Sequence, residues 1–172
     1  WNHGTFMGAT CSSETTAAAT GAVGVVRRDP MAMLPFVGYN ANDYIQHWVN
    51  IGEKGDADKL PKIFFVNWFR KSPEGKFLWP GFGENSRVLE WVVRRLEGSV
   101  EAIDTPAGAI PAEGSLNVDG LDIDAAKLDA ATKFDAEEWK NEIPLIEEWF
   151  DKLGNVPDAV KAELDTLKAN LA

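Results

Sequence analysis

The sequence predicts a mixed α+β fold, and three of its features support that class. A short unbroken apolar run, Ile63 to Val66, stands between turn-forming residues, as expected of a buried strand. Several longer segments repeat apolar residues every three or four positions, which is typical of helices that cover a core. A chain of 172 residues, 45% of them hydrophobic, can bury such a core as one ordinary domain.

The composition argues against several classes of partner. The formal net charge is -10, and a field of that sign repels phosphate groups, so we expect neither a nucleic-acid-binding protein nor one that binds acidic membranes. The single cysteine, Cys11, can form no internal disulfide, and no apolar run reaches the roughly 20 residues of a membrane helix. No leader-like segment opens the chain, so we expect a cytoplasmic protein.

The N-terminal segment is predicted to be a strand followed by a long loop. Thr5 to Ala9 is expected to form the strand, and because the chain begins at Trp1 rather than methionine we expect a piece of a longer protein. Cys11 to Gly24 is rich in Ser, Thr, Ala and Gly and has little apolar bulk, so it is expected to be a mobile surface loop. A loop of this length is either a lid or binding loop or a plain disordered linker, and both readings remain open.

A second strand and a first helix follow. Val23 to Arg28 is expected to be a short strand that stops at Asp29-Pro30, since the residue before a proline avoids helical geometry. Asn40 or Asn42 is expected to cap a helix with apolar residues at helical spacing, namely Tyr44, Ile45, Trp48 and Val49. His47 has no Cys, His or paired carboxylate at ligand spacing, so we interpret it as an ordinary helical histidine.

Residues 62–98 are predicted to form a strand, an aromatic loop and a helix. The strand is Ile63 to Val66, which would need neighbouring strands on both sides. A helix of about three turns is expected from Ser86 to Gly98, on the apolar residues Val88, Leu89, Val92, Val93 and Leu96. Thr105 to Pro111 is turn-rich and has room for a further short strand.

Residues 124–172 are acidic, alanine-rich and predicted to be helical. One helix repeats apolar residues at spacings of three or four, at Trp139, Ile143, Ile146, Phe150 and Leu153. Pro157 opens a last helix with one apolar stripe, formed by Val160, Leu164, Leu167 and Leu171. We expect the two to form an antiparallel helical hairpin whose acidic outer faces are solvated.

The stretch from Asn67 to Arg87 places five large aromatic rings among glycines, a proline and cations. Such a loop suits a flat, anionic ligand such as a nucleotide, although the rings would equally serve as core residues, and composition does not decide between the two. Asn85 also has two readings. It is either the N-cap of the following helix, or its amide reads the edge of a base covered by Phe69, Phe77 or Phe82.

Two motifs in this stretch resemble a known family. They are N-W-F-R-K at 67–71 and G-K-F-L-W-P-G-F-G-E-N-S-R-V-L-E-W at 75–91, and both resemble the C-terminal part of GTP-dependent phosphoenolpyruvate carboxykinase. Further similar segments are Trp1 to Gly4, Ser13 to Ala19, Asp29 to Met33 and Pro35 to Asn40. The resemblance spans about residues 1–120 and continues as a similar helical tail, so the whole chain, 1–172, is expected to be a fragment of the C-terminal GTP-binding domain.

The resemblance implies roles for particular residues. The guanine ring would lie between Phe69 and Phe82, with Phe77 beside them and Asn85 on the base edge. The implied GTP-binding segment is Phe82-Gly83-Glu84-Asn85. Residues 9–22 would form a lid that closes over the active site, with the lid residues Ser12, Ser13, Glu14, Thr15, Thr16 and Ala17.

The resemblance also implies a reaction, the conversion of oxaloacetate and GTP to phosphoenolpyruvate, GDP and CO₂ in gluconeogenesis. The implied cofactors are Mn²⁺ and, with the nucleotide, Mg²⁺. This sequence contains neither a G-x-x-x-x-G-K-[ST] phosphate loop nor a Lys, His and Asp set that can be assigned to manganese. The resemblance implies that the phosphate loop, the catalytic residues and the metal ligands lie in a preceding part of the polypeptide, so we expect the fragment alone to be inactive. The enzyme is expected to be a monomer.

Two other function classes share parts of this pattern. A non-catalytic module that binds purine nucleotides would have the aromatic loop and lack the phosphate loop. A carbohydrate-binding module would use exposed Trp68 and Trp79 as stacking platforms, although sugars do not require the adjacent cations.

Overall fold

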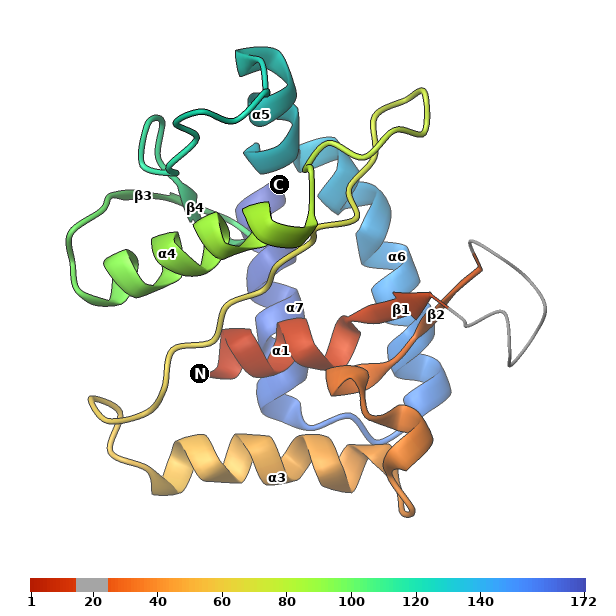
Figure 1. The fold of residues 1–172 in the computed structure, drawn as a ribbon. Helices are drawn as coiled ribbons and strands as arrows, with labels where there is room; N and C mark the ends of the chain where they lie inside the picture. The colour runs from red at the N-terminus through yellow and green to blue at the C-terminus, as the bar shows by residue number, and fades with distance from the viewer. Residues whose placement is uncertain (15–24) are drawn as a thin grey trace. The chain divides into compact units, whose positions relative to one another are not determined.

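The computed structural model describes residues 1–14 and 25–172, which divide into two compact units (Figure 1). The first unit comprises Trp1–Ile63 and Ala136–Ala172, and the second comprises Phe64–Asp135. Each unit contains helices and one two-stranded antiparallel sheet among its described residues. The α+β class predicted from the sequence is therefore confirmed.

The first element, α1, is a helix over Asn2–Thr10, so the strand predicted at Thr5 to Ala9 is wrong. Glycine and threonine have weak intrinsic helix propensity, but tertiary packing overrides it. Phe6 and Ala9 on α1 are fully buried. A Cβ added at Gly8 would lie 2.2 Å from the Met31 sulfur, which shows how closely α1 approaches its neighbours.

Two strands follow α1 and form the sheet of the first unit. β1 (Ser12–Glu14) pairs antiparallel with β2 (Val26–Arg28), so Ser12 lies opposite Arg28 and Glu14 opposite Val26. We call these paired strands the lid stem. The loop predicted over Cys11 to Gly24 is wrong at Ser12–Glu14, because backbone pairing with β2 orders these polar residues. Residues 15–24 lie outside the described part of the chain, and with them Thr15, Thr16 and Ala17.

The chain then passes through two short 3-10 turns, η1 (Pro30–Ala32) and η2 (Leu34–Phe36), into helix α3 (Ala41–Lys54). Asn40 is the N-cap, since its side chain accepts a hydrogen bond from the Asn42 amide at 2.8 Å. Asn42 is buried and donates to the Leu153 carbonyl at 2.7 Å. The predicted helix is confirmed, and its cap is the first of the two asparagines.

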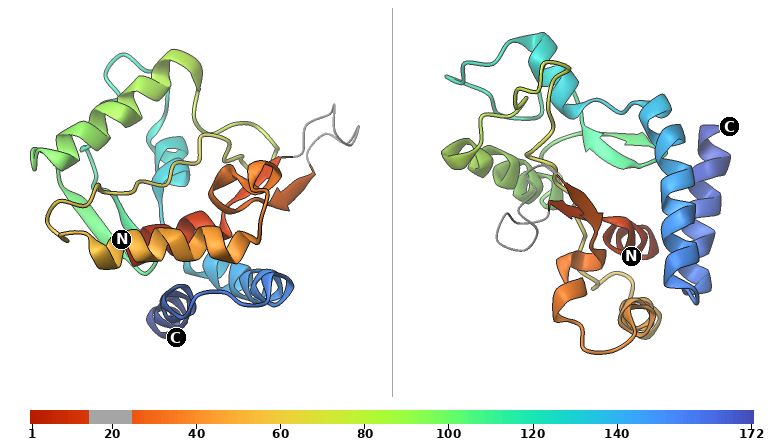
Figure 2. Two further views of the ribbon diagram at one scale, coloured as in Figure 1. Left: turned by 90° about the horizontal axis from the view of Figure 1, so that it is seen from below. Right: turned by 90° about the vertical axis from the view of Figure 1, so that its right-hand side faces the viewer.

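Helices α6 (Ala136–Leu153) and α7 (Asp158–Leu171) complete the first unit and run side by side in opposite directions (Figure 2). Their buried apolar side chains follow the periodicity seen in the sequence, and they are Ile146, Phe150, Val160, Leu164, Leu167 and Leu171. The Phe6 ring of α1 meets the Phe150 ring of α6 edge to face, with 6.4 Å between their centroids. Helix α1 is thus part of the core that these two helices cover.

The second unit consists of η3 (Phe82–Glu84), α4 (Asn85–Leu96), the hairpin β3 (Ala102–Thr105) and β4 (Gly108–Pro111), and α5 (Ala125–Thr132). The helix predicted from Ser86 is confirmed as α4, and the turn-rich segment at 105–111 carries most of the hairpin. The core of this unit is a cluster of Trp79, Trp91, Val100 and Leu116. Phe64 packs against it, with its ring edge to face with Trp91 at 6.4 Å.

The strand predicted at Ile63 to Val66 is wrong. Within the described residues this segment pairs with no strand, and three of its side chains are exposed by 37–60%, namely Ile63, Phe65 and Val66. An apolar run forms a buried strand only where neighbouring strands supply partners for its backbone groups. Here Phe64 alone of the four packs on the tryptophan cluster.

Candidate nucleotide-binding site

The aromatic stretch divides its rings between core and surface. Trp79 is only 6% exposed and belongs to the core cluster, and Trp68 packs against that cluster. The three phenylalanines are exposed, Phe69 by 74%, Phe77 by 50% and Phe82 by 96%. The carbohydrate-binding reading is therefore wrong for Trp79, whose face is covered, whereas the phenylalanine faces are open to a flat ligand.

Phe69 and Phe77 are brought together by a small hairpin. Lys71 and Phe77 form an isolated antiparallel bridge, and the Leu78 amide donates to the Arg70 carbonyl at 2.9 Å. The Phe69 and Phe77 rings then lie 6.1 Å apart at 64°, and the Lys71 ammonium stands 5.1 Å from the Phe77 ring centre. The result is an exposed pair of rings beside a positive charge.

Phe82 stands apart from this pair. Its ring contacts no other ring among the residues that the structure describes. Its backbone has φ 49°, in the left-handed region that a bulky residue seldom occupies, and it follows Gly81 at φ 81°. Because the backbone here turns outward, Phe82 projects fully into solvent without being held in contact with Phe69 or Phe77.

Gly83 and Glu84 join Phe82 to the first turn of α4. The Gly83 carbonyl accepts a hydrogen bond from the Ser86 hydroxyl at 2.7 Å, and the Glu84 carboxylate pairs with Arg87 one turn along. Both residues therefore have a structural role in holding the start of the helix.

Asn85 does not act as the N-cap of α4. It is the first residue of the helix, the cap position is Glu84, and no side chain makes a capping hydrogen bond there. The Asn85 amide oxygen instead accepts a hydrogen bond from the Trp79 indole N–H at 3.1 Å. The cap reading of Asn85 is thus wrong, and its half-buried amide is held by the tryptophan core.

The expected lid residues lie partly in the lid stem and partly outside the described residues. Ala9 and Thr10 belong to α1, and the lid residues Ser12, Ser13 and Glu14 form β1. Ser13 is half-buried and Glu14 is exposed. The pairing of Glu14 with Val26 holds the two ends of the intervening segment side by side.

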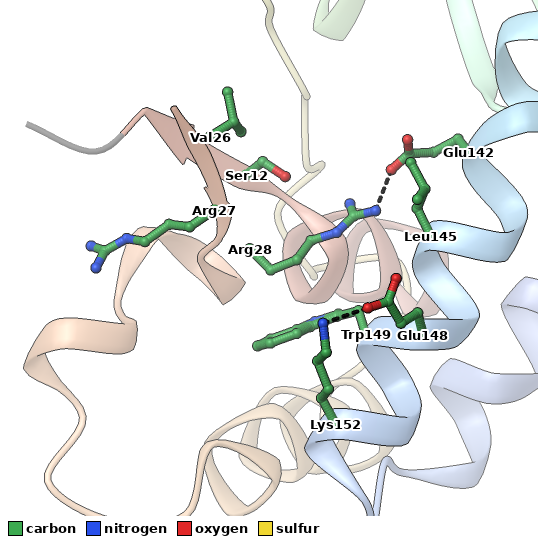
Figure 3. A pocket seen from close by; sticks show the side chains of 9 residues that line it. All are labelled: Ser12, Val26, Arg27, Arg28, Glu142, Leu145, Glu148, Trp149 and Lys152. Atoms are coloured by element: carbon green, nitrogen blue, oxygen red, sulfur yellow. Dashed lines mark hydrogen bonds and ion pairs between the residues drawn. The ribbon is translucent and has the colours of Figure 1, made fainter. Parts of the chain in front are cut away.

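Helix α6 supports this stem through residues that the sequence did not single out. The Arg28 guanidinium donates to the Thr10 carbonyl at 2.7 Å and to Glu142 at 2.5 Å, and the Trp149 indole donates to the Ala9 carbonyl at 3.1 Å. Glu142 and Trp149 are far from the stem in sequence, so no local pattern marks them. Figure 3 shows Arg28 reaching from β2 toward Glu142.

A pocket of about 300 Å³ lies beside the stem, lined on the α6 side by Glu142, Leu145, Glu148, Trp149 and Lys152 (Figure 3). The Lys152 ammonium donates to Glu148 at 2.6 Å, and this bond lowers the pKa of the Glu148 carboxyl below its ordinary value. The charged groups of the pocket are thus largely paired with one another.

Cys11 connects α1 to the stem. Its thiol donates to the Asp29 carbonyl at 2.9 Å and is half-buried. Burial raises the pKa of the Cys11 thiol, because the charged thiolate is poorly solvated there. The thiol form is therefore favoured at neutral pH.

The described residues hold neither a metal-ligand cluster nor a membrane-spanning helix. Across residues 1–14 and 25–172, no three side chains of His, Cys, Asp or Glu are grouped so as to hold a metal ion, and His47 is exposed on α3. None of the helices described is at once long and apolar enough to cross a membrane.

Comparison with known proteins gives a consistent family. Residues 1–170 match the family model described as "Phosphoenolpyruvate carboxykinase C-terminal P-loop domain". Relatives named "Phosphoenolpyruvate carboxykinase [GTP]" include those of Paenarthrobacter aurescens strain TC1 and Renibacterium salmoninarum, each 56% identical over 172 residues. The relative of that name from Anaeromyxobacter sp. strain K is 52% identical over 167 residues.

These alignments cover nearly all of this chain but a minor part of each relative. They include 99% of the chain for the first two relatives and 95% for the third. In each case the matched segment is 28% of the relative's own length.

Proposed function

The chain belongs to the family of the phosphoenolpyruvate carboxykinase C-terminal P-loop domain, and we propose that it recognises the guanine base of GTP within a GTP-dependent phosphoenolpyruvate carboxykinase. The observation that carries the proposal is the exposed Phe69 and Phe77 pair beside the Lys71 charge. Exposed rings held in fixed geometry by a hairpin are suited to stacking rather than to core packing.

The base would stack on these rings, with Phe82 covering its other face. Stacking on an aromatic side chain contributes about 1–3 kcal/mol per base. The 96% exposure of Phe82 is consistent with a ring that finds its partner only when a base is present. Gly83 and Glu84 would hold the backbone between Phe82 and Asn85, whose amide would read the edge of the base.

Residues 9–22 would act as the lid of the active site. The described part of this segment supports the proposal through the lid stem, whose strands hold the ends of the segment together. A lid that closes over bound substrates would exclude water from a reactive enolate. Thr15, Thr16 and Ala17 are assigned to the lid by the family resemblance alone.

The reaction proposed for the whole enzyme starts with loss of CO₂ from oxaloacetate, which leaves an enolate. The enolate oxygen then takes the γ-phosphoryl group of GTP, giving phosphoenolpyruvate and GDP. Mn²⁺, and Mg²⁺ with the nucleotide, would neutralise the developing charge when bound. This chain's share in the reaction would be nucleotide selection and lid support. We further propose a cytoplasmic, monomeric enzyme of gluconeogenesis.

The alternative, a non-catalytic purine-nucleotide module, is not favoured, because the relatives that match the chain are named as carboxykinases. It would share the same base-binding residues. An intact polypeptide that binds GDP but releases no CO₂ from oxaloacetate in the presence of GTP and Mn²⁺ would support the module instead.

The assignment of Asn85 is tested by Asn85→Ala in the intact polypeptide, with calorimetric titration of GDP and ADP. Loss of one hydrogen bond to the base is expected to weaken GDP binding about 10-fold and to leave ADP binding unchanged or improved. Asn141→Ala, at an exposed position on α6, is the matched control and should bind both nucleotides as the parent does. A GDP to ADP ratio that Asn85→Ala leaves unchanged would refute the assignment.

A further inference from the structure

We propose that Trp79 is a positioning residue that turns the amide nitrogen of Asn85 toward the ligand, so that the site selects purines with a carbonyl oxygen at C6. This inference rests on the proposed function, because it takes Asn85 to be the residue that reads the base. It adds a residue that does not itself touch the nucleotide.

The first step is the contact between the two side chains. The Trp79 indole nitrogen lies 3.1 Å from the Asn85 amide oxygen, within hydrogen-bond range. Trp79 is 6% exposed and is packed with Trp91, Val100 and Leu116. Because the core holds the indole ring, the direction of its N–H group is fixed before any ligand arrives.

The second step follows from the chemistry of the donor. An indole nitrogen can donate a hydrogen bond but cannot accept one. The amide of Asn85 must therefore face Trp79 with its oxygen, and the opposite orientation would set two donors against each other. The positions of the oxygen and the nitrogen of the Asn85 amide are therefore assigned from the chemistry of their partner.

With its oxygen facing Trp79, the Asn85 amide leaves its nitrogen free to meet a ligand. The Asn85 amide nitrogen has no hydrogen-bond partner in the described residues, and it is not among the buried unpartnered atoms, so solvent reaches it. No side chain makes a capping hydrogen bond at α4, so the Asn85 amide is not bonded to the helix backbone. It presents two N–H donors at the start of α4, in the same unit as the exposed phenylalanines.

A fixed pair of donors discriminates between purines. Guanine and hypoxanthine carry an acceptor oxygen at C6, which complements the Asn85 amide nitrogen. Adenine carries an amino group there, and two facing donors would leave both groups unpaired. The site thus rejects adenine by an unfavourable contact as well as by the loss of a favourable one. It should accept inosine nucleotides, whose base lacks only the 2-amino group of guanine.

The test compares two buried tryptophans of one cluster in the intact polypeptide. Trp79→Phe keeps an aromatic ring in the core and removes the N–H that faces Asn85. Trp91→Phe is the matched control, since Trp91 is also 6% exposed and loses an equivalent hydrogen bond, from its indole nitrogen to the Ser115 hydroxyl at 2.9 Å. Titration calorimetry with GDP, IDP and ADP gives the affinities.

The expected result for Trp79→Phe is a loss of about 5- to 10-fold in affinity for both GDP and IDP, with ADP affinity unchanged or higher, because the released amide can turn its oxygen toward the adenine amino group. Trp91→Phe should leave the GDP to ADP ratio unchanged, because a general loosening of the core does not turn the Asn85 amide. Equal changes in the two variants would overturn the positioning role of Trp79.

Failure of this inference can be distinguished from failure of the proposed function. If Asn85→Ala abolishes the preference for GDP while Trp79→Phe keeps it, the positioning role is wrong and guanine recognition stands. If the parent protein shows no preference for GDP over ADP, the proposed function is wrong as well.

A second variant covers the case in which Trp79→Phe does not fold. Asn85→Asp keeps an acceptor for the Trp79 indole and removes the outward donors. It should lose GDP affinity at least as strongly as Asn85→Ala does. Unchanged binding of GDP by Asn85→Asp would show that the amide nitrogen does not read the base and would overturn the inference.

Discussion

Arg28 is predicted to be the main anchor of the lid stem, and Arg28→Met should open it. The guanidinium of Arg28 donates from one nitrogen to the Thr10 carbonyl and from the other to the Glu142 carboxylate. Methionine has a similar length and keeps much of the apolar stem of the side chain, but it makes neither bond. We expect β1 and β2 to separate more often and the rest of the first unit to stay folded.

The size of the effect follows from the geometry of Arg28. A hydrogen bond that involves a charged group contributes about 1.5–3 kcal/mol, whereas a fully exposed ion pair contributes about 0–1 kcal/mol. The Arg28 side chain is 17% exposed and that of Glu142 is 35% exposed, so the pair lies between these limits. Together with the bond to Thr10, we expect the free energy of stem opening to fall by about 2 kcal/mol, which is roughly a 30-fold rise in the open population.

Hydrogen exchange of the backbone amides in Ser12–Glu14 and Val26–Arg28 measures this opening directly. The neighbouring arginine provides the control, because Arg27 is 47% exposed and lies 3.9 Å from Asp29, so Arg27→Met should change exchange little. Glu142→Gln keeps an acceptor for Arg28 and should show a smaller effect than Arg28→Met. Equal acceleration in the Arg27 and Arg28 variants would refute the anchoring role of Arg28.

Two further predictions concern α1 and its surroundings. Burial raises the pKa of the Cys11 thiol, so its alkylation by iodoacetamide should reach half its maximal rate at a higher pH in the folded protein than after unfolding in urea. The stability linked to the protonated thiol is present below the pKa of the unfolded state and is lost as the pH rises through the pKa of the folded state. Coincident pH profiles of alkylation in the two states would contradict this prediction. Gly8→Ala should lower the stability in urea titration by less than about 1 kcal/mol, because the new methyl would stand 2.2 Å from the sulfur of the flexible Met31 side chain, which can move aside, while alanine favours the helix. Met31→Ala in the same chain should make Gly8→Ala stabilising, and a loss above about 2 kcal/mol in Gly8→Ala alone would show that Met31 cannot move.

The sequence predicted those elements whose own periodicity determines them. In α3, α6 and α7 the apolar stripe at helical spacing supplies the buried face of the helix. In α4 only Val88 and Val92 of the predicted set pack on the core, whereas Leu89, Val93 and Leu96 are exposed by 53–57%. Asn40 could be named as one of two caps, because capping depends on residues close in sequence.

The elements that failed are those decided by distant neighbours. Helix α1 has glycines and threonines that disfavour a helix in isolation, and its helical form depends on packing against α3 and α7. The apolar run at Ile63 to Val66 has the composition of a buried strand, but composition does not reveal whether a partner strand exists.

The candidate site was predictable in location and not in detail. The aromatic stretch was recognised from its rings and glycines, yet nothing local distinguishes the buried Trp79 from the exposed Phe82. The bond between Trp79 and Asn85 requires the turn at Gly81, whose positive φ becomes visible only in three dimensions. Glu142 reaches the lid stem and Trp149 reaches the end of α1 from a separate helix, and no sequence spacing indicates such an approach.

The division of the chain into units also bears on how it is made. The second unit is one continuous stretch, 64–135, whereas the first joins residues 1–63 to 136–172. During synthesis, at about 5–20 residues per second, the ribosome releases everything the second unit needs before it releases α6 and α7. Phe6 is fully buried against Phe150 in the folded protein. Several seconds therefore pass between the synthesis of Phe6 and that of Phe150, and during this time Phe6 cannot make the contact. In that interval the face of α1 that carries Phe6 lacks its contact with α6.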